Sequence, residues 1–204
     1  VREDRRKDQE LSEARDFQLK MIAKEIPDYQ GMNIKAYMRT STEVGGDYYD
    51  FFELEDGSFY VVCGDATGHG SQSGMMVSIT KAGLYGLELD QPNESLVKLN
   101  QAIKAIDLGK MRMSLNIAKF QNSKVTLSSA GMPPAYYFDS QKNEIEEILV
   151  PGLPLGSVKN ADDLEGAGHI WSFLKDEKGL MHPWVRCYVH LGEEYDHFIS
   201  KLED

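Results

Sequence analysis

Two glycine–aspartate segments contain the residues best suited to chemistry. They are residues 43–50 (EVGGDYYD) and 63–70 (CGDATGHG), in which a glycine directly precedes Asp47 and Asp65. Glycine permits a tight backbone and the close approach of a ligand, and a short carboxylate presents two hard oxygens. Two carboxylates a few Å apart repel each other unless a cation lies between them, and Mg²⁺ or Mn²⁺ suits such oxygens. The alternative is that each pair only forms a turn.

The surrounding pattern predicts how the two aspartates meet. Residues 48–54 and 58–64 have the composition of strands, and Asp56-Gly57 between them is a strong hairpin signal. Asp47 lies ten residues before Gly57 and Asp65 eight after it, so the register of a hairpin roughly closes. We therefore expect the two carboxylates at one end of a sheet.

Other functions of the glycine-rich loop fail on its residues. A cysteine phosphatase needs arginine six positions after its cysteine, where this chain has His69. A Walker loop needs a lysine, and none occurs between Tyr60 and Thr80. The spacing of the glycines is one residue too long for a dinucleotide turn. His69 itself remains open between a general acid or substrate contact and a residue that only packs.

The remaining periodicity predicts an α+β protein. Helical spacing covers 71–89 and 94–106, the second helix beginning near Asn93 as a cap, and alternation predicts a strand at 34–38. Further strands are predicted at 113–120, 124–129, 135–138 and 145–150. This order favours antiparallel sheet with segregated helices. Residues 1–25 predict an amphipathic helix that either docks on its own domain or pairs with another helix.

Composition limits the possible partners and compartments. The 204 residues carry a formal net charge of −11 and are 41% hydrophobic, which fits one folded domain and excludes disorder and collagen. Such an acidic chain argues against nucleic-acid binding. Two cysteines form no disulfide framework, and no apolar run approaches the roughly 20 residues of a membrane span. We expect a cytoplasmic location, and the initial Val1 suggests a piece of a longer protein.

Four segments together resemble the motifs of a known family. They are 43–50, 64–70 (GDATGHG), 130–134 (AGMPP) and 152–156 (GLPLG), and their order is similar to that in bacterial PPM-type protein phosphatases of the RsbU/SpoIIE branch, over about residues 10–160. Met132 stands where the family usually has histidine. The resemblance implies an αββα sandwich of two antiparallel sheets flanked by helices.

The same resemblance implies a mechanism and partners. Asp47, Asp65 and the backbone carbonyl of Ala66 would bind two Mg²⁺ or Mn²⁺ ions, and a metal-activated water would attack phosphoserine or phosphothreonine. Family substrates are phosphorylated STAS-domain anti-anti-sigma factors. The domain division would be a linker helix at 1–25, through which the chain could dimerise or receive a signal from an upstream sensor domain, and a phosphatase domain at 26–204.

Residues 164–204 depart from the family pattern. Both tryptophans and four of the five histidines fall there, and the family's later acidic motifs are missing. The nearest candidate for a further ligand is Asp176, in the sequence LKDEKG. Two functions therefore stay open: a working metal-dependent phosphatase, and a catalytically impaired relative that binds a phosphorylated partner or transmits a signal.

Overall fold

The structure is a computed structural model that describes most of the chain between residues 45 and 157. The described residues are 6, 9, 12–13, 15–17, 19–29, 32, 34–38, 45–122, 124–139, 142, 144–157, 168–169 and 183–186.

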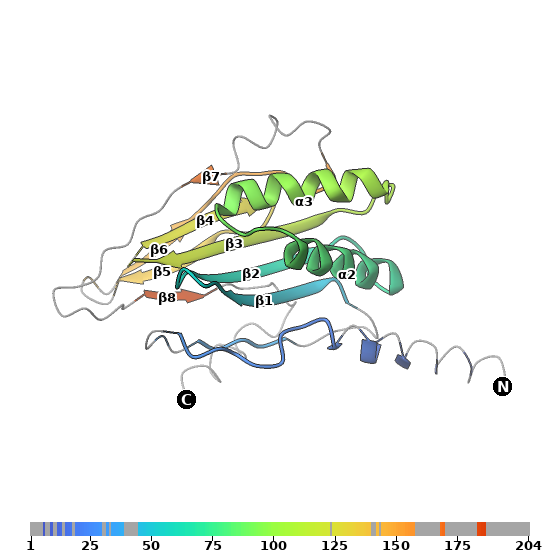
Figure 1. The fold of residues 1–204 in the computed structure, drawn as a ribbon, viewed down its shortest axis with the longest axis horizontal. Coiled ribbons are helices and arrows are strands. Elements are labelled where there is room, and N and C mark those ends of the chain that lie inside the picture. The colour runs from blue at the N-terminus through green and yellow to red at the C-terminus, as the bar shows by residue number, and fades with distance from the viewer. Residues whose placement is uncertain are drawn as a thin grey trace.

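The described elements form two antiparallel sheets and a helix pair (Figure 1). The larger sheet has the order β1-β2-β3-β4-β7, and the smaller has the order β6-β5-β8. In chain order the elements are β1 (Asp47–Glu53), β2 (Phe59–Ala66), α2 (Ser71–Gly86), α3 (Pro92–Ile106), β3 (Met113–Gln121), β4 (Lys124–Ala130), β5 (Ala135–Asp139), β6 (Glu144–Ile148), β7 (Gly168–His169) and β8 (Pro183–Arg186).

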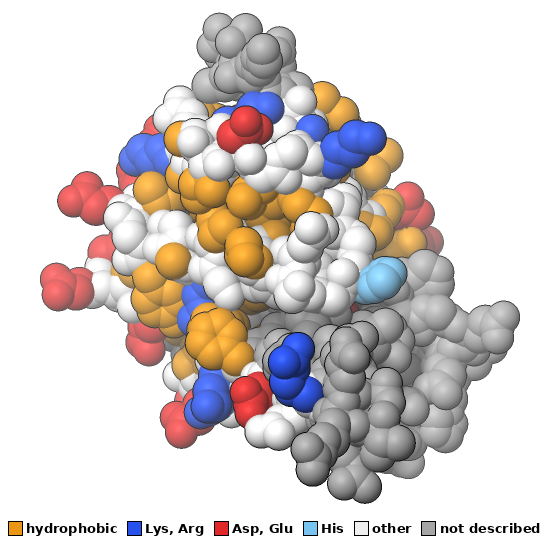
Figure 2. Space-filling view, turned by 90° about the vertical axis from the view of Figure 1, so that its right-hand side faces the viewer, with side chains coloured by type: hydrophobic (Ala, Val, Ile, Leu, Met, Phe, Trp, Pro, Cys, Tyr) orange, Lys and Arg blue, Asp and Glu red, His pale blue; other side chains and the backbone are white. Residues whose placement is uncertain are grey.

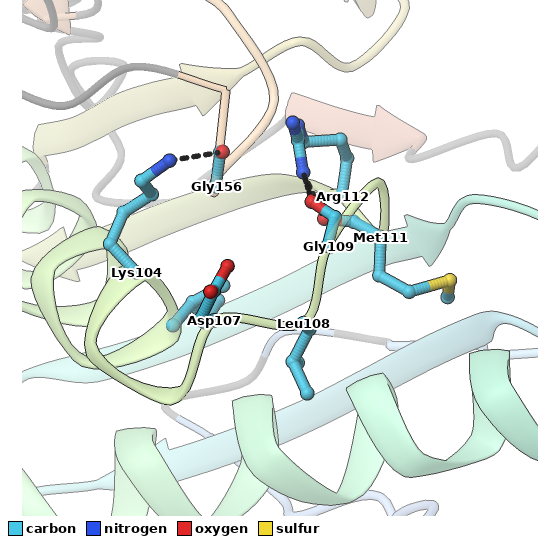
Figure 3. A pocket seen from close by; sticks show the side chains of 8 residues that line it. Lys104, Asp107, Leu108, Gly109, Met111, Arg112 and Gly156 are labelled. Carbon is cyan, nitrogen blue, oxygen red and sulfur yellow. Dashed lines mark hydrogen bonds between the residues drawn. The ribbon is translucent and has the colours of Figure 1, made fainter.

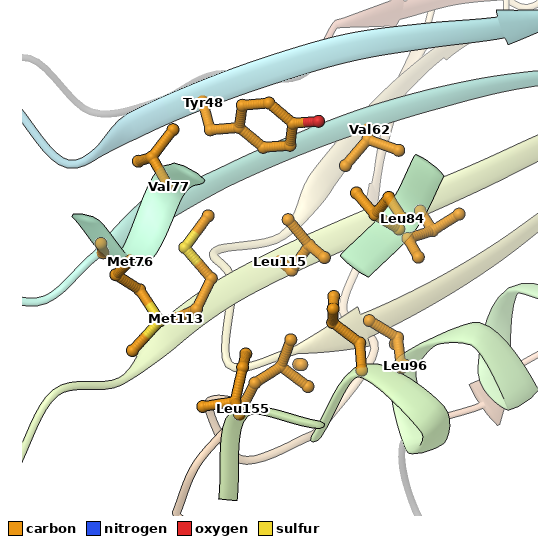
Figure 4. Packing of buried hydrophobic residues seen from close by; sticks show 14 of the residues in the cluster. Tyr48, Val62, Met76, Val77, Leu84, Leu96, Met113, Leu115 and Leu155 are labelled. Atoms are coloured by element: carbon orange, nitrogen blue, oxygen red, sulfur yellow. The ribbon is translucent and has the colours of Figure 1, made fainter. Parts of the chain in front are cut away.

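Strand alternation divides the core of the larger sheet between two neighbouring layers. On one face, Tyr48, Val62 and Leu115 pack with Met76 and Leu84 of α2 and with residues of α3 (Figure 4). On the other face, Phe59, Phe120 and Leu127 form a second cluster with Ala135 and Ile148 of the smaller sheet. The layers are thus helix pair, large sheet and small sheet. This confirms the α+β class with antiparallel sheets flanked by helices; a helix layer beyond the small sheet is not among the described elements.

Most predicted elements are confirmed, with two corrections. The strand predicted at 34–38 is wrong, because these residues have no strand pairing. Their side chains do alternate between half-buried and exposed, and Ile34 packs against the second core cluster. The alternation of side chains at 34–38 therefore reflects a segment with one buried side, and its backbone does not pair with another strand. The helix α3 begins one residue before the predicted cap, because Pro92 occupies its first turn and Asn93 lies inside the helix.

The segments 130–134 and 152–156 together close one end of the large sheet. A Cβ on Gly131, whose φ is 73°, would lie 2.6 Å from the Pro154 ring, so glycine lets the two segments touch. Leu155 exchanges backbone hydrogen bonds of 3.1 and 2.8 Å with Met113, the first residue of β3. These contacts extend the sheet past the end of β4.

The N-terminal residues contribute little to the described core. Between residues 6 and 19, the described backbone is helical and the side chains are exposed, including those of Phe17 and Leu19, whereas Ile22 is buried. The division at residue 25 and the pairing of this helix stay predictions. None of the helices in the described part of the chain is long and apolar enough to cross a membrane.

A buried ion pair ties α2 to β1. The side chain of Asp50 is 3% exposed and accepts hydrogen bonds from Lys81 Nζ at 2.5 Å, from the Tyr48 hydroxyl at 2.9 Å and from the backbone N–H of Phe51 at 3.0 Å. Lys81 also lies 4.9 Å from the centroid of the Tyr85 ring. Removing one partner of a buried pair leaves the other charge uncompensated.

We predict that Lys81→Met lowers the free energy of unfolding by about 3 kcal/mol, because it leaves the buried Asp50 carboxylate without a cationic partner. The double variant Asp50→Asn/Lys81→Met should lose less than the sum of the single variants. Urea unfolding provides the measurement, with Lys98→Met on the exposed side of α3 as the control. Equal stability of wild type and Lys81→Met would contradict this view of the pair.

Candidate metal centre

The β1–β2 hairpin places the two aspartates opposite each other. Asp47 and Asp65 are direct partners in the antiparallel register, so their side chains leave the same face of the sheet. The turn that sets this register is held by hydrogen bonds of 2.9 Å between Leu54 and Ser58 and of 2.9 Å from the Ser58 N–H to the Asp56 carboxylate. The structure therefore brings together the two carboxylates that the sequence suggested would meet.

Because Gly46 has no side chain, two further oxygen atoms can approach the backbone next to Asp47. A Cβ at this position would lie 2.4 Å from the carbonyl oxygen of Ala66 and 2.8 Å from Oδ1 of Asp65. The Ala66 N–H donates to the Gly46 carbonyl at 3.0 Å, which fixes the two backbones at this approach. The Ala66 carbonyl oxygen and Oδ1 of Asp65 thus lie against Gly46, next to Asp47, at an approach that any side chain would prevent. These are hard oxygen donors, and they fit Mg²⁺ or Mn²⁺.

The electrostatics of the pair favour a cation. Burial, and after it the charge of the neighbouring Asp65, together raise the pKa of Asp47 to about 6. Burial also raises the pKa of Asp65. Without a cation, the fold therefore resists holding both groups ionised. A divalent ion between them would reverse that preference.

A polar row lies directly behind the carboxylates on the same face of the sheet. Asn116 is the register partner of Cys63 on one side and of Ser129 on the other. All three side chains are buried, and the oxygens of the Asn116 and Ser129 side chains have no hydrogen-bond partner within the described chain. The sequence analysis missed this row, because its members are scattered over three strands. This row makes the space between the two sheets polar at the end where the two aspartates lie.

The other predicted site residues differ in what the structure shows of them. His69 lies in the loop at 67–70 with an exposed side chain, so it does not pack into the core, and its role in chemistry stays a prediction. Asp176 lies outside the described residues. Within the described part of the chain, no group of three or more His, Cys, Asp or Glu side chains could hold a metal ion. The described donor set is therefore two carboxylates and a carbonyl.

Sequence analysis also missed Arg112. Its backbone pairs with Thr67, the residue after Ala66, through a Thr67 N–H to Arg112 carbonyl bond of 3.0 Å. No motif surrounds Arg112, so the only signal in the sequence is a cation placed just before a strand.

Solved structures with a similar fold define the class of domain. The SiaA-PP2C domain of Pseudomonas aeruginosa aligns with a TM-score of 0.60 and 15% identity over 76% of this chain and 65% of that chain. A bacterial serine phosphatase bearing an arginine-to-glutamate mutation aligns with a TM-score of 0.52 and 13% identity over 78% of this chain and 83% of that chain. This chain therefore has the fold of PP2C-type phosphatase domains.

Sequence comparison gives the family. The model of stage II sporulation protein E (SpoIIE) matches residues 55–170, more than half of the chain, and the chain belongs to this family. The phosphoserine phosphatase RsbP of Bacillus subtilis (strain 168) is 24% identical over 216 residues, which cover 96% of this chain and 51% of RsbP. The chain thus spans about half the length of that relative. The resemblance seen in the motifs is confirmed at the level of the family.

The raised pKa of Asp47 predicts a pH-dependent stability difference. Its folded pKa of about 6 exceeds its ordinary value of 3.8, so without metal its ionisation costs stability as pH rises from about 4 through about 6. Asp47→Asn should therefore raise the metal-free unfolding free energy by about 1–2 kcal/mol at pH 7.5 and change it little at pH 4. Urea unfolding at both pH values measures the difference, with exposed Asp28→Asn as the control. An Asp47→Asn variant that is less stable than wild type at pH 7.5 would contradict the prediction.

The space at Gly46 predicts a second effect. Gly46→Ala should weaken Mn²⁺ binding at least tenfold, because the new methyl group would displace the Ala66 carbonyl and the Asp65 carboxylate. Calorimetric Mn²⁺ titration measures the affinity. Gly86→Ala is the matched control, since a Cβ at Gly86 meets nothing within 4 Å. Unchanged Mn²⁺ affinity in Gly46→Ala would remove Gly46 from the site.

Proposed function

We propose that this chain is a metal-dependent protein phosphatase that hydrolyses phosphoserine or phosphothreonine on a partner protein. The observation that carries the proposal is the facing pair of Asp47 and Asp65, with the Ala66 carbonyl drawn into the same space by Gly46. Membership of the SpoIIE family supports it. In this proposal the three groups bind Mg²⁺ or Mn²⁺.

Each group has a distinct task. Bound divalent ions would supply an activated water and neutralise charge that develops on the phosphoryl group. Asp47 and Asp65 are partners in the hairpin register, so both carboxylates would bind the same ion. The Ala66 carbonyl adds a neutral donor that does not increase the repulsion between the carboxylates. His69, exposed on the following loop, is accessible to a substrate or leaving group as a contact or general acid.

The proposed partner is a phosphorylated STAS-domain protein. RsbP is named a phosphoserine phosphatase, and this chain covers 51% of it, so RsbP contains segments beyond this domain. We propose correspondingly that a sensor domain of the same protein acts upstream, through the N-terminal segment at residues 1–25, whose described backbone is helical between residues 6 and 19, and that this segment supports a homodimer. A cytoplasmic location fits such a role.

A second function is favoured by the small described donor set. Two carboxylates are fewer than the resemblance implies for two ions, and no third one joins them among the described residues. A catalytically impaired protein that binds a phosphorylated partner or transmits a signal would retain the fold and the partner surface. Asp176 would be the residue that separates the two functions, if it completes the metal set.

Phosphate release from a phosphoserine protein tests the proposal. We predict release that depends on added Mn²⁺ and falls at least 10³-fold in Asp65→Asn, because the variant removes a metal-binding charge. Exposed Asp28→Asn should retain wild-type turnover. A folded wild-type protein with no Mn²⁺-dependent release would support the impaired alternative. Undiminished turnover in Asp65→Asn would instead show that the site lies elsewhere.

A further inference from the structure

A basic depression lies between the end of α3 and the start of β3. Although the chain has a net charge of −11, residues 104–112 contain three cations, Lys104, Lys110 and Arg112, and one carboxylate, Asp107. Lys104, Arg112 and Gly156 line the depression together with Asp107 (Figure 3). Figure 2 shows Lys and Arg side chains, with an acidic side chain between them, in the upper part of this end of the molecule, above a hydrophobic patch. We call the surface formed by Lys104 and Arg112, together with the exposed Lys110 beside the depression, the basic depression.

Its cations are oriented by carbonyl groups. Nη1 of Arg112 donates to the carbonyl oxygens of Gly109 at 2.8 Å and Met111 at 2.7 Å. Nζ of Lys104 donates to the carbonyl of Gly156 at 3.3 Å. Carbonyl groups hold a cation in place without cancelling its charge. The ion pairs of the described residues, Lys81–Asp50 and Lys119–Asp90, involve none of these three cations.

The basic depression adjoins the candidate metal centre through the backbone. Asp65 pairs with Ser114 and Ala66 with Met113 in the β2–β3 register. The next residues continue this pairing, since the Thr67 N–H donates to the Arg112 carbonyl and the Arg112 N–H donates to Oγ1 of Thr67, both at 3.0 Å. Arg112 therefore lies at the same end of the sheet as the carboxylates. A peptide that extended from the metal centre around this end of the sheet toward α3 would bring its neighbouring residues to these cations.

The acidic character of the whole chain makes local cations useful for binding an acidic substrate. A phosphorylated, acidic segment approaching this chain is repelled by its net charge of −11. Local cations counter that repulsion, and the planar guanidinium group of arginine suits carboxylates in particular. We infer that the basic depression binds acidic residues that flank the phosphorylated residue of the substrate. This inference rests on the proposed function and adds a sequence preference to it.

The experiment compares three fluorescent peptides on the whole chain in the presence of Mn²⁺. One carries phosphoserine followed by three aspartates, the second replaces the aspartates with alanines, and the third has the aspartates but unphosphorylated serine. Fluorescence anisotropy should show the first peptide binding about tenfold more tightly than the second. The third should compete with the first, because its carboxylates alone contact the depression.

Variants connect the preference to named residues. Arg112→Gln should abolish the preference for the acidic peptide, and Lys110→Gln, an exposed position without a described structural contact, should reduce it about threefold. Lys98→Gln, elsewhere on α3, is the control and should leave it unchanged. Circular dichroism checks that each variant is folded. If Arg112→Gln does not fold, Lys110→Gln still tests the inference.

Each result bears on one of the two claims. Equal affinity of the acidic and neutral phosphopeptides would overturn the inference, as would a preference that Arg112→Gln and Lys110→Gln both retain. Failure of the unphosphorylated peptide to compete would show that the cations bind the phosphate, which also overturns it. Phosphate release measured on the same samples tests the proposed function separately. A preference without turnover would contradict only the function, and turnover without a preference only the inference.

Discussion

The antiparallel register of β1 and β2 sets Asp47 opposite Asp65, and the features at this end of the large sheet are arranged around that pairing. It places two like charges at one sheet end, where burial raises the pKa of both groups. This arrangement does not by itself stabilise the folded state, because a carboxyl group is harder to ionise when its neighbour is charged. The hairpin turn, the close approach at Gly46 and the Ala66–Gly46 hydrogen bond all maintain it. The divalent-cation site that we propose would explain why these features occur together.

The space between the two sheets changes character along the strands. Far from the aspartates, Phe59, Phe120 and Val125 form an apolar cluster that joins the sheets. Nearer to them, Cys63, Asn116 and Ser129 form a polar row, and the carboxylates follow at the end. The apolar part supplies the burial that stabilises the sandwich, at about 25 cal/mol per Å². Stability and chemistry are thereby separated along the same strands, while the Asp50–Lys81 pair keeps α2 in place beside them.

The sequence predicted those parts of the fold that local patterns determine. The Asp56-Gly57 turn and the flanking runs were enough to predict the hairpin and the meeting of the aspartates. The error at residues 34–38 arose because alternation measures burial and cannot show whether a backbone partner exists. Arg112 and the polar row could not be predicted, since their neighbours come from other strands. The roles of Asp47, Asp65 and Ala66 remain predictions, and Asp176 lies outside the described residues.

A crystal structure of the protein soaked with Mn²⁺ would show whether Asp47 and Asp65 bind a metal ion. We predict an anomalous difference peak in contact with the carboxylates of Asp47 and Asp65 and with the carbonyl oxygen of Ala66. The remaining ligands around that peak would also show whether Asp176 contributes. Absence of a peak at this sheet end in well-diffracting, Mn²⁺-saturated crystals, or a peak bound only by other residues, would contradict the account.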